Sequence, residues 1–239
     1  MSTKNGTAAK AFELTRERIA VLGYGAVARE HALALRREGA DVAVGLRFGG
    51  MSWVRAQHDG FAAEPASKAV MRANVVALFV PDDEQIGVYF DAIDAELPAG
   101  ALLVVGRGLA LATGALEPRD LDVVLVKGTT GHVRVAVHHD ATGTALERAI
   151  AYARIVFGRH AAITTTTIEA EASTELADMA ARVGGYAALA VEVADAVTRA
   201  CETHAPDEAK VRFYDRLHTL LDEHAMPPSA RISGVRGLS

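Results

Sequence analysis

Short apolar runs alternate with helix-length amphipathic segments along the chain up to about residue 163. The apolar runs occupy residues 19–22, 42–46, 75–80, 101–105, 122–126 and 133–137. The segments expected to be helices are 26–38, 51–58, 83–93 and 142–156. Buried parallel strands joined by crossover helices have this pattern. We therefore predict an α/β fold built on buried parallel strands.

The pattern changes after the threonine run at 164–167. The segments 169–201 and 207–224 are rich in alanine, have a helical period and contain no strand candidate. Gly184 and Gly185 fall within the first of these segments, where such a pair weakens a helix and permits close packing. We predict a second, all-helical region here.

These patterns divide the chain into three parts. We expect a disordered tail over residues 1–15, an α/β domain over 16–163 and a helical domain over 164–239. A helical domain of this length is small for an independent core, so its helices should pack on a partner subunit as well as on the sheet.

Composition narrows the class of protein. The chain has 239 residues, is 50% hydrophobic and 23% charged, and carries a formal charge of -5, so it is not an intrinsically disordered chain. One cysteine, Cys201, excludes an intramolecular disulfide framework and a multi-cysteine zinc site. No apolar run approaches the roughly 20 residues that cross a bilayer. We expect a cytoplasmic protein with no membrane or nucleic-acid partner.

The sharpest local motif follows the first strand, in the order Gly23, Tyr24, Gly25, Ala26, Val27 and Ala28. In dinucleotide-binding units the first glycine makes the tight turn and the second lets the backbone approach the pyrophosphate. The third position needs a small residue, which Ala28 supplies, and the following helix presents unpaired N–H groups to the phosphates. The motif predicts a Rossmann-type dinucleotide-binding domain.

The end of the second predicted strand indicates which dinucleotide binds. Arg47 can hold a 2′-phosphate bidentately and Ser52 can donate a hydroxyl to it. The only nearby acid, Asp41, lies at the start of the strand instead of its end, where an acid would bind the ribose of NAD. NADPH is favoured over NADH. The alternative is that Arg47 is an ordinary surface residue.

With these residues in view, the sequence resembles the short-chain class of ketol-acid reductoisomerases. The resemblance runs from Ile19 to about Ser233. It rests on IAVLGYG, VGLRFGGMSW, VPDDEQ (80–85), Gly131-His132, HHDATGTALERAIAYA (138–153), Gly184-Gly185 and LH at 217–218. It implies NADPH contacts at Tyr24, Gly25, Arg47, Ser52, Asp82, Gln85 and Gly131.

The resemblance breaks at the positions that carry the family's isomerisation. Family members move an alkyl group across two magnesium ions held by four carboxylates, and then reduce the product with NADPH. The matching positions here are Thr174, Asp178, Asp215 and Thr219. Because neutral hydroxyls do not replace the lost negative charge, we expect no metal ligands and no two-magnesium site.

Other family positions have changed too. Arg107 stands where the family has its active-site histidine, and Lys127 lies one place away from the family's lysine. Ser233 matches a substrate-binding serine, but the chain stops soon after it, without the family's final helices. The resemblance implies a homodimer in which Asp215 of one subunit approaches Asp178 of the other.

Several charged residues are candidates for chemistry. Arg107 lies after a strand and could clamp a substrate carboxylate or a cofactor phosphate, while Lys127 could polarise a carbonyl. Asp215, with His218 one turn later, could relay a proton, although a structural histidine is an equal alternative.

Glu171, Glu175 and Asp178 recur on one helix face. This acidic stripe is either a rebuilt acidic site or a solvated face, and the sequence leaves both interpretations open.

These observations favour an NADPH-dependent oxidoreductase that reduces a small-molecule ketone or imine without magnesium-dependent isomerisation. In this interpretation Lys127, Asp178, Asp215 and His218 are the catalytic candidates, and Arg107 and Ser233 bind substrate. The first alternative is a non-catalytic NADPH-binding regulatory protein. The second is a true ketol-acid reductoisomerase.

Overall fold

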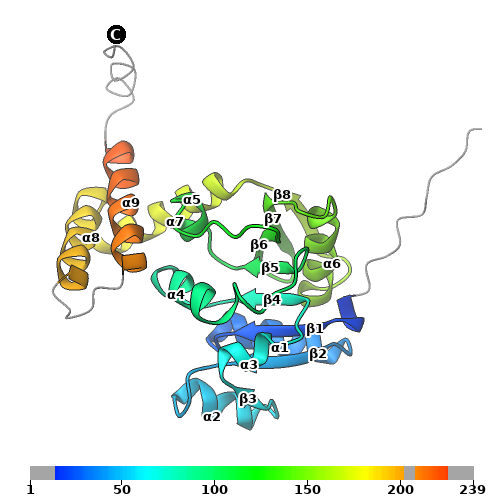
Figure 1. Cartoon of the computed structure of the whole chain (residues 1–239). Coiled ribbons are helices and arrows are strands. Elements are labelled where there is room, and N and C mark those ends of the chain that lie inside the picture. The colour runs from blue at the N-terminus through cyan, green and yellow to red at the C-terminus, as the bar shows by residue number, and fades with distance from the viewer. Residues whose placement is uncertain (1–13, 202–207, 226–239) are drawn as a thin grey trace, which may run out of the picture.

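The computed structural model describes residues 14–201 and 208–225, and its centre is one sheet with the strand order β3-β2-β1-β4-β5-β6-β7-β8 (Figure 1). The strands are β1 (Arg18–Leu22), β2 (Asp41–Gly45), β3 (Ala63–Glu64), β4 (Val75–Leu78), β5 (Leu102–Val105), β6 (Asp122–Gly128), β7 (His132–His139) and β8 (Ala162–Thr165). The strands from β3 to β6 in this order are mutually parallel. The predicted α/β fold class is confirmed.

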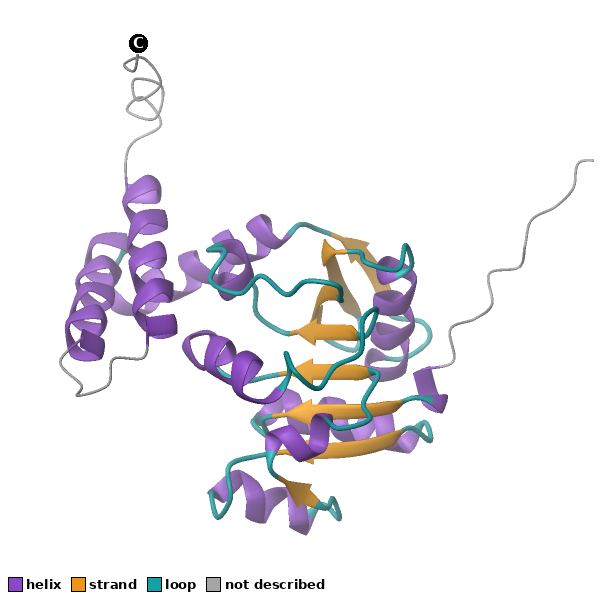
Figure 2. Ribbon diagram, viewed as in Figure 1, coloured by secondary structure: helices purple, strands orange, loops and turns teal. Residues whose placement is uncertain are grey.

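Helices cover both faces of the sheet (Figures 1 and 2). On one face lie α1 (Ala26–Arg37), α2 (Met51–His58) and α6 (Ala145–Phe157), whose buried residues share a core with the sheet. On the other lie α3 (Ala66–Val70), α4 (Asp82–Ala92), α5 (Leu109–Ala112) and α7 (Ile168–Val183). A short 3-10 helix, Leu14–Arg16, precedes β1, so the end of the tail predicted over residues 1–15 is ordered, with Leu14 buried; residues 1–13 of that tail lie outside the described residues.

The central strands are apolar throughout because both of their faces are covered. In β4, Val75 and Ala77 pack into the core beneath α1 and α6, whereas Val76 and Leu78 pack into the core beneath α4. All four residues of this strand are fully buried. Such strands appear in the sequence as uninterrupted apolar runs, which is why their positions were predictable.

Three features of the sheet lie outside the predicted pattern. β7 runs antiparallel to β6, because the turn between them is too short for a parallel crossover. β3 has two residues, and β8 is a mostly exposed edge strand containing Thr164 and Thr165, so neither shows an apolar run. β8 spans residues 163 and 164, the boundary that we predicted between domains, and that division remains a proposal.

The sequence predicts Gly184 and Gly185 within one long helix, and the structure shows that this prediction is wrong, because the pair lies between two helices. Gly184 ends α7 in the left-handed region at φ +96°, and Gly185 follows at φ +122°. The amide of Gly185 donates to Ala180 O, and α8 (Tyr186–Cys201) then begins. Residues with a Cβ rarely adopt two consecutive positive φ angles, so the pair marks the break between two helices.

The helices of the second region extend beyond the carboxyl ends of the parallel strands (Figure 2). α8 packs against α9 (Glu208–Ala225), and Phe213, Leu217 and Leu221 of α9 join the core that contains α4 and α5. The second region therefore closes over the edge of the sheet where ligands bind in this class of fold. No helix within the described ranges is long and apolar enough to cross a membrane.

Candidate functional site: a dinucleotide groove beside two buried carboxylates

The site lies where strand order reverses, between β1 and β4. The loops after these two parallel strands diverge to opposite sides of the sheet, which leaves a crevice at their carboxyl ends. Loops after β1, β2, β4, β5 and the end of β6 all contribute residues to the hollows along this edge.

The loop after β1 has the geometry of a phosphate cradle. Gly23 has φ +93°, and a Cβ there would come within 2.6 Å of Phe79 O, so a side chain is excluded both by conformation and by space. A Cβ on Gly25 would meet nothing within 4 Å, so this backbone faces open space. Gly25 is also the N-cap of α1 and has no side chain to occupy the first amides of the helix. These features fit a pyrophosphate.

The side chain of Tyr24, in the same loop, is buried. Its hydroxyl donates to Asp59 Oδ2 at 3.0 Å, and Arg29 Nε donates to the same oxygen at 2.6 Å. The hydrogen bond from Arg29 lowers the pKa of Asp59 to about 2. Tyr24 can therefore serve the cradle through its backbone, while its side chain ties the loop to the segment after α2.

A hollow of about 790 Å³ lies beside the cradle at the end of β2. Arg47 and Ser52 both line it, as the sequence analysis expected of residues that hold a 2′-phosphate. Arg47 is highly exposed, and its Nη2 lies 3.1 Å from Glu84 Oε2 across the hollow. Arg47 is thus available at the surface, with one carboxylate competing for its guanidinium.

A second hollow, of about 370 Å³, continues along the carboxyl ends of β4, β5 and β6. It shares Gly25, Phe79 and Val80 with the first, so the two form one groove across the N-terminus of α1. Gln85 lines it and is fully buried; its Nε2 donates to Val80 O at 3.3 Å, and its Oε1 has no hydrogen-bond partner among the described residues.

His31 lies in the wall of this second hollow and contributes packing. Its Nδ1 is 2.9 Å from the hydroxyl of Tyr152, and its ring meets Phe79 edge to face. Burial lowers the pKa of His31 to about 3, so the imidazole is neutral at physiological pH. Its burial in this wall was not predicted from the sequence.

Lys127 lines the same hollow at the end of β6 and is held by a buried carboxylate on α7. Its Nζ lies 3.1 Å from Glu175 Oε1, and Glu175 Oε2 accepts from the amide of Gly108 at 3.2 Å. Glu175 thus fixes both Lys127 and the loop after β5. We had weighed Glu175 as part of a stripe that could be solvated, but its side chain is buried.

The acidic stripe divides in the structure. Glu171 is buried too and accepts from Arg134 Nε at 2.6 Å, whereas Asp178 is exposed. Glu171 and Glu175 lie beside the buried apolar positions Ala172 and Leu176. That placement on the apolar face of α7 was the sequence signal that could have shown their burial.

Arg107, in the loop after β5, forms an ion pair with Asp82, at the start of α4. Asp82 is 7% exposed, and its Oδ1 has no hydrogen-bond partner among the described residues. Burial raises the pKa of Asp82, and the neighbouring Arg107 opposes that shift. Arg107 therefore belongs to the site, but part of its charge is already neutralised by a residue of the chain.

Other predicted site residues lie elsewhere. Asp178 and Asp215 are exposed and His218 is partly buried; none of the three lines the hollows described above. Gly131 lies in the exposed turn between β6 and β7, also outside the two hollows. Ser233 lies outside the described residues. The roles assigned to these residues remain predictions.

The two threonines at family metal positions face their own helices. Thr174 Oγ1 donates to Ala170 O at 3.0 Å, and Thr219 Oγ1 donates to Asp215 O at 3.1 Å. Such bonds are usual for exposed hydroxyls within helices. Within the described residues, no group of three or more histidines, cysteines or acids is arranged to hold a metal ion.

Comparison with known proteins decides the family. The sequence profile of the family "Acetohydroxy acid isomeroreductase, NADPH-binding domain" matches residues 13–162. The chain belongs to this family. The resemblance found from the motifs is therefore confirmed, and it covers the whole described sheet except the last residues of β8.

The relatives are ketol-acid reductoisomerases (NADP⁺). The enzyme of Beutenbergia cavernae is 37% identical over 224 residues, which cover 87% of this chain and 64% of the relative. That of Xanthomonas euvesicatoria pv. vesicatoria is 37% identical over 221 residues, covering 86% and 65%. The chain therefore spans less than two thirds of the length of these relatives.

A solved structure gives the same fold. An NADH-preferring ketol-acid reductoisomerase from an uncultured archean superimposes with a TM-score of 0.65 at 24% identity, covering 92% of this chain and 75% of that one. At this identity the likeness supports the fold alone, including the helical segments beyond residue 162.

Proposed function

We propose that this family member is an NADPH-dependent oxidoreductase that reduces a C=O or C=N bond of a small molecule. The observation that carries the proposal is the continuous groove across the N-terminus of α1. Arg47 lies at one end of this groove, and Lys127 and Arg107 lie at the other. This arrangement supports a proposed 2′-phosphate contact at Arg47 and a proposed polarising cation at Lys127 or Arg107, on either side of the loop from Gly23 to Gly25.

The chain's own residues suit NADPH. Arg47 and Ser52 would hold the 2′-phosphate, and the backbone from Gly23 through Ala26 and Val27 would hold the pyrophosphate. Gln85 lines the groove, and its buried Oε1, which has no partner within the described ranges, can accept from a nicotinamide amide or a ribose hydroxyl. When bound, NADPH supplies a hydride. The family resemblance adds Asp82 and Gly131 as contacts.

Lys127 and Arg107 would stabilise the charge that develops on the reduced bond. Glu175 holds the Lys127 ammonium close to the groove, where a nearby positive charge stabilises an alkoxide or orients a proton toward it. Asp178, Asp215 and His218 would act only if a second subunit brings them to the groove. We propose such a homodimer, with Ser233 as a further substrate contact.

The proposed reaction uses no magnesium. The positions that match the family's four metal carboxylates hold two aspartates and two threonines whose hydroxyls bond their own helices. Two magnesium ions need hard, largely anionic ligands in octahedral geometry, and this donor set does not supply them. We therefore propose reduction without alkyl migration, in a protein that acts in the cytoplasm.

The cofactor half of the proposal is tested by calorimetric titration of NADPH and NADH. The wild-type protein should bind NADPH more tightly, and Arg47→Ala should weaken NADPH binding about tenfold or more, with little effect on NADH. Glu84→Gln should strengthen NADPH binding by releasing Arg47 from its ion pair. Arg55→Ala, which removes an exposed arginine from α2, is the matched control.

Equal affinity of the wild-type protein for NADPH and NADH would contradict the assignment of Arg47. The catalytic half is tested by following NADPH oxidation in the presence of EDTA with a panel of ketones, 2-oxo acids and cyclic imines. Failure across the panel, in a protein that binds NADPH, would contradict an oxidoreductase. Conversion of acetolactate that requires magnesium would contradict the metal-independent reaction.

A further inference from the structure

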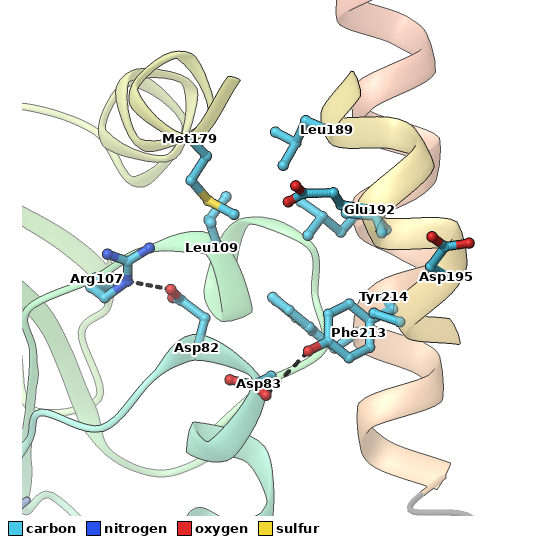
Figure 3. Close-up of a pocket in the computed structure, with 13 residues that line it drawn as sticks. Asp82, Asp83, Arg107, Leu109, Met179, Leu189, Glu192, Asp195, Phe213 and Tyr214 are labelled. Atoms are coloured by element: carbon cyan, nitrogen blue, oxygen red, sulfur yellow. Dashed lines mark hydrogen bonds and ion pairs between the residues drawn. The ribbon is translucent and has the colours of Figure 1, made fainter. Parts of the chain in front are cut away.

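A cavity of about 540 Å³ adjoins the groove, between the N-terminus of α4 and the helices α8 and α9 (Figure 3). Arg107 lines both this cavity and the second hollow of the groove, so the two spaces meet at that side chain. A molecule in the cavity would therefore lie next to the end of the groove that holds Lys127. A substrate bound there would be close to a cofactor held in the groove.

Negative charge dominates the walls of the cavity. Among the described residues that line it, four are carboxylates and one, Arg107, is a cation. The carboxylates are Asp82, Asp83, Glu192 and Asp195. Asp83 accepts from the hydroxyl of Tyr214 at 3.1 Å and lies 4.0 Å from Lys210 Nζ. Even with Arg107 and Lys210 counted, the acids outnumber the cations.

Only one of the two carboxylate oxygens of Asp82 has a hydrogen-bond donor among the described residues. Its Oδ2 accepts from Arg107, while its Oδ1 has no hydrogen-bond partner among the described residues, although the side chain is more than nine-tenths buried. Burial of an unpartnered carboxylate oxygen is unfavourable unless a donor reaches it. The direction of the Asp82 pKa, which burial raises, agrees with a missing positive partner.

Glu192 faces Asp82 across the cavity. Its carboxylate projects from α8 toward Leu109 and Met179 (Figure 3), and no hydrogen bond or ion pair to it is present among the described residues. A cation in the space between these two carboxylates would therefore be attracted by both of them.

The rest of the cavity wall favours an organic cation over a metal ion. Leu189, Val193 and Phe213 supply apolar surface, and Met179 supplies a thioether, whereas magnesium would require a shell of oxygen ligands. The aromatic rings of Phe213 and Tyr214 line the same space and can add cation–π attraction. Acids combined with apolar and aromatic surface suit a protonated nitrogen attached to a hydrocarbon frame.

We propose that this cavity binds an organic cation, so that the substrate of the reductase is a protonated imine. The inference rests on the proposed function and narrows it from C=O or C=N to an iminium. The iminium carbon accepts the hydride of NADPH, and the π electrons of the C=N bond pass to nitrogen. The products are a neutral amine and NADP⁺, and the amine then takes a proton from water.

Calorimetric titration of the NADP⁺-loaded protein tests the proposal with three small probes of similar size. These are 2-methylpyrrolidine, which is cationic at neutral pH, cyclopentanone, which is neutral, and cyclopentanecarboxylate. We expect 2-methylpyrrolidine to bind best. Glu192→Gln should weaken it about fivefold, because a partly exposed charge pair is lost. Glu192 is exposed, so folding is not at risk.

Asp91→Asn is the matched control, because it removes an exposed carboxylate from the same helix as Asp82 without touching the cavity. It should leave the affinity for 2-methylpyrrolidine unchanged. Glu192→Lys should abolish binding of 2-methylpyrrolidine and strengthen cyclopentanecarboxylate. In turnover, protonated 2-methyl-1-pyrroline should be reduced faster than cyclopentanone or a 2-oxo acid.

Other outcomes separate the two proposals. Preference of the NADP⁺-loaded wild type for cyclopentanecarboxylate, or an unchanged affinity for 2-methylpyrrolidine in Glu192→Gln, would overturn the cation site while leaving the reductase intact. Magnesium chloride that displaces 2-methylpyrrolidine stoichiometrically would show a metal site and overturn it too. A wild-type protein that does not bind NADPH would overturn the proposed function itself.

Discussion

Two aspartate–arginine pairs lie at opposite ends of the parallel strands, which we call the amino edge and the carboxyl edge of the sheet. The pairs differ in how many of the aspartate oxygens have hydrogen-bond donors. Asp122 begins β6 at the amino edge and pairs with Arg148 of α6, 2.7 Å away, with both side chains buried. Asp82 follows β4 at the carboxyl edge and pairs with Arg107, whose side chain is 41% exposed. The pair of Asp122 and Arg148 is thus buried from solvent, whereas the pair of Asp82 and Arg107 is partly exposed.

The hydrogen bonds to the two aspartates explain the difference. Oδ2 of Asp122 accepts from Arg148 and from the hydroxyl of Thr142, and Oδ1 accepts from the amide of Thr142. Burial raises the pKa of Asp122, but these donors outweigh it, and the pKa lies below its ordinary value. Among the residues that the structure describes, Asp82 has one donor and its Oδ1 has no hydrogen-bond partner, and burial keeps its pKa raised.

A buried charged pair can have a structural role or can form part of a binding site, and the hydrogen bonds to its acceptors distinguish the two cases. A buried pair whose acceptors are all satisfied holds two elements together and has nothing left to bind a ligand. A buried pair with one free acceptor beside a cavity is unfavourable for the folded chain alone and becomes favourable when a donor arrives. Among the described residues, the aspartate at the carboxyl ends of the strands therefore has an unpartnered acceptor beside a cavity, whereas the aspartate at the amino ends has none.

The largest expected effect comes from breaking the amino-edge pair. Arg148→Met leaves Asp122 buried without its cation, so the free energy of unfolding should fall by about 3–5 kcal/mol in urea denaturation at pH 7. A double variant, Arg148→Met with Asp122→Leu, should recover part of this loss because the fully buried carboxylate of the pair is removed as well, although the carboxylate of Glu17 still loses its cation. A loss below about 1 kcal/mol in the single variant would contradict a structural pair.

A smaller effect concerns pH and involves His31 beneath the carboxyl edge. Its pKa of about 3 in the folded protein lies below the ordinary value of 6.5, so the unfolded chain binds the extra proton first as pH falls. Stability should decline as pH falls below the unfolded value, with a loss from His31 of about 2 kcal/mol between pH 7 and pH 5.

Urea unfolding at the two pH values, for the wild type and for His31→Gln, measures this contribution. Glutamine can still hydrogen bond Tyr152 but does not titrate, so the loss between pH 7 and pH 5 should be smaller in the variant by that amount. An identical pH dependence in the two proteins would mean that folding does not lower the pKa of His31.

The smallest effect on stability is expected for Asp82, and its sign is opposite to the sign expected for Asp122. The folded pKa of Asp82 is raised, so its ionised form is disfavoured above the unfolded pKa, and Asp82→Asn should change stability at pH 7 by less than about 1 kcal/mol, toward greater stability. The folded pKa of Asp122 is lowered, so Asp122→Asn should destabilise at the same pH.

Thermal unfolding of Asp82→Asn and Asp122→Asn measures the same chemical change, loss of a carboxylate, at each end of the parallel strands. Asp91→Asn on the exposed face of α4 serves as the control and should be neutral. Destabilisation by Asp82→Asn equal to that by Asp122→Asn would remove the distinction between the edges, and with it the structural support for a ligand site at Asp82.

Local patterns were enough to predict much of the fold. The apolar runs of β1, β4, β5 and β6 are visible because strands buried on both faces need apolar residues at every position. The loop from Gly23 to Gly25 was visible because its backbone conformation and close contacts require glycine. The edge strand β8 and the break at Gly184 were not predicted, because neither produces an apolar period.

The sequence by itself determined the central parallel strands, the glycine loop after β1 and the position of the arginine at the end of β2, since each follows from periodicity or from short-range backbone geometry. Only the tertiary structure decided which charges are buried and what they face. Tyr214 donates to Asp83 across 131 positions of the chain, and Glu175 reaches Lys127 across 48. Such contacts depend on how α7 and α9 pack over the sheet, and the spacing of residues along the chain does not encode that packing.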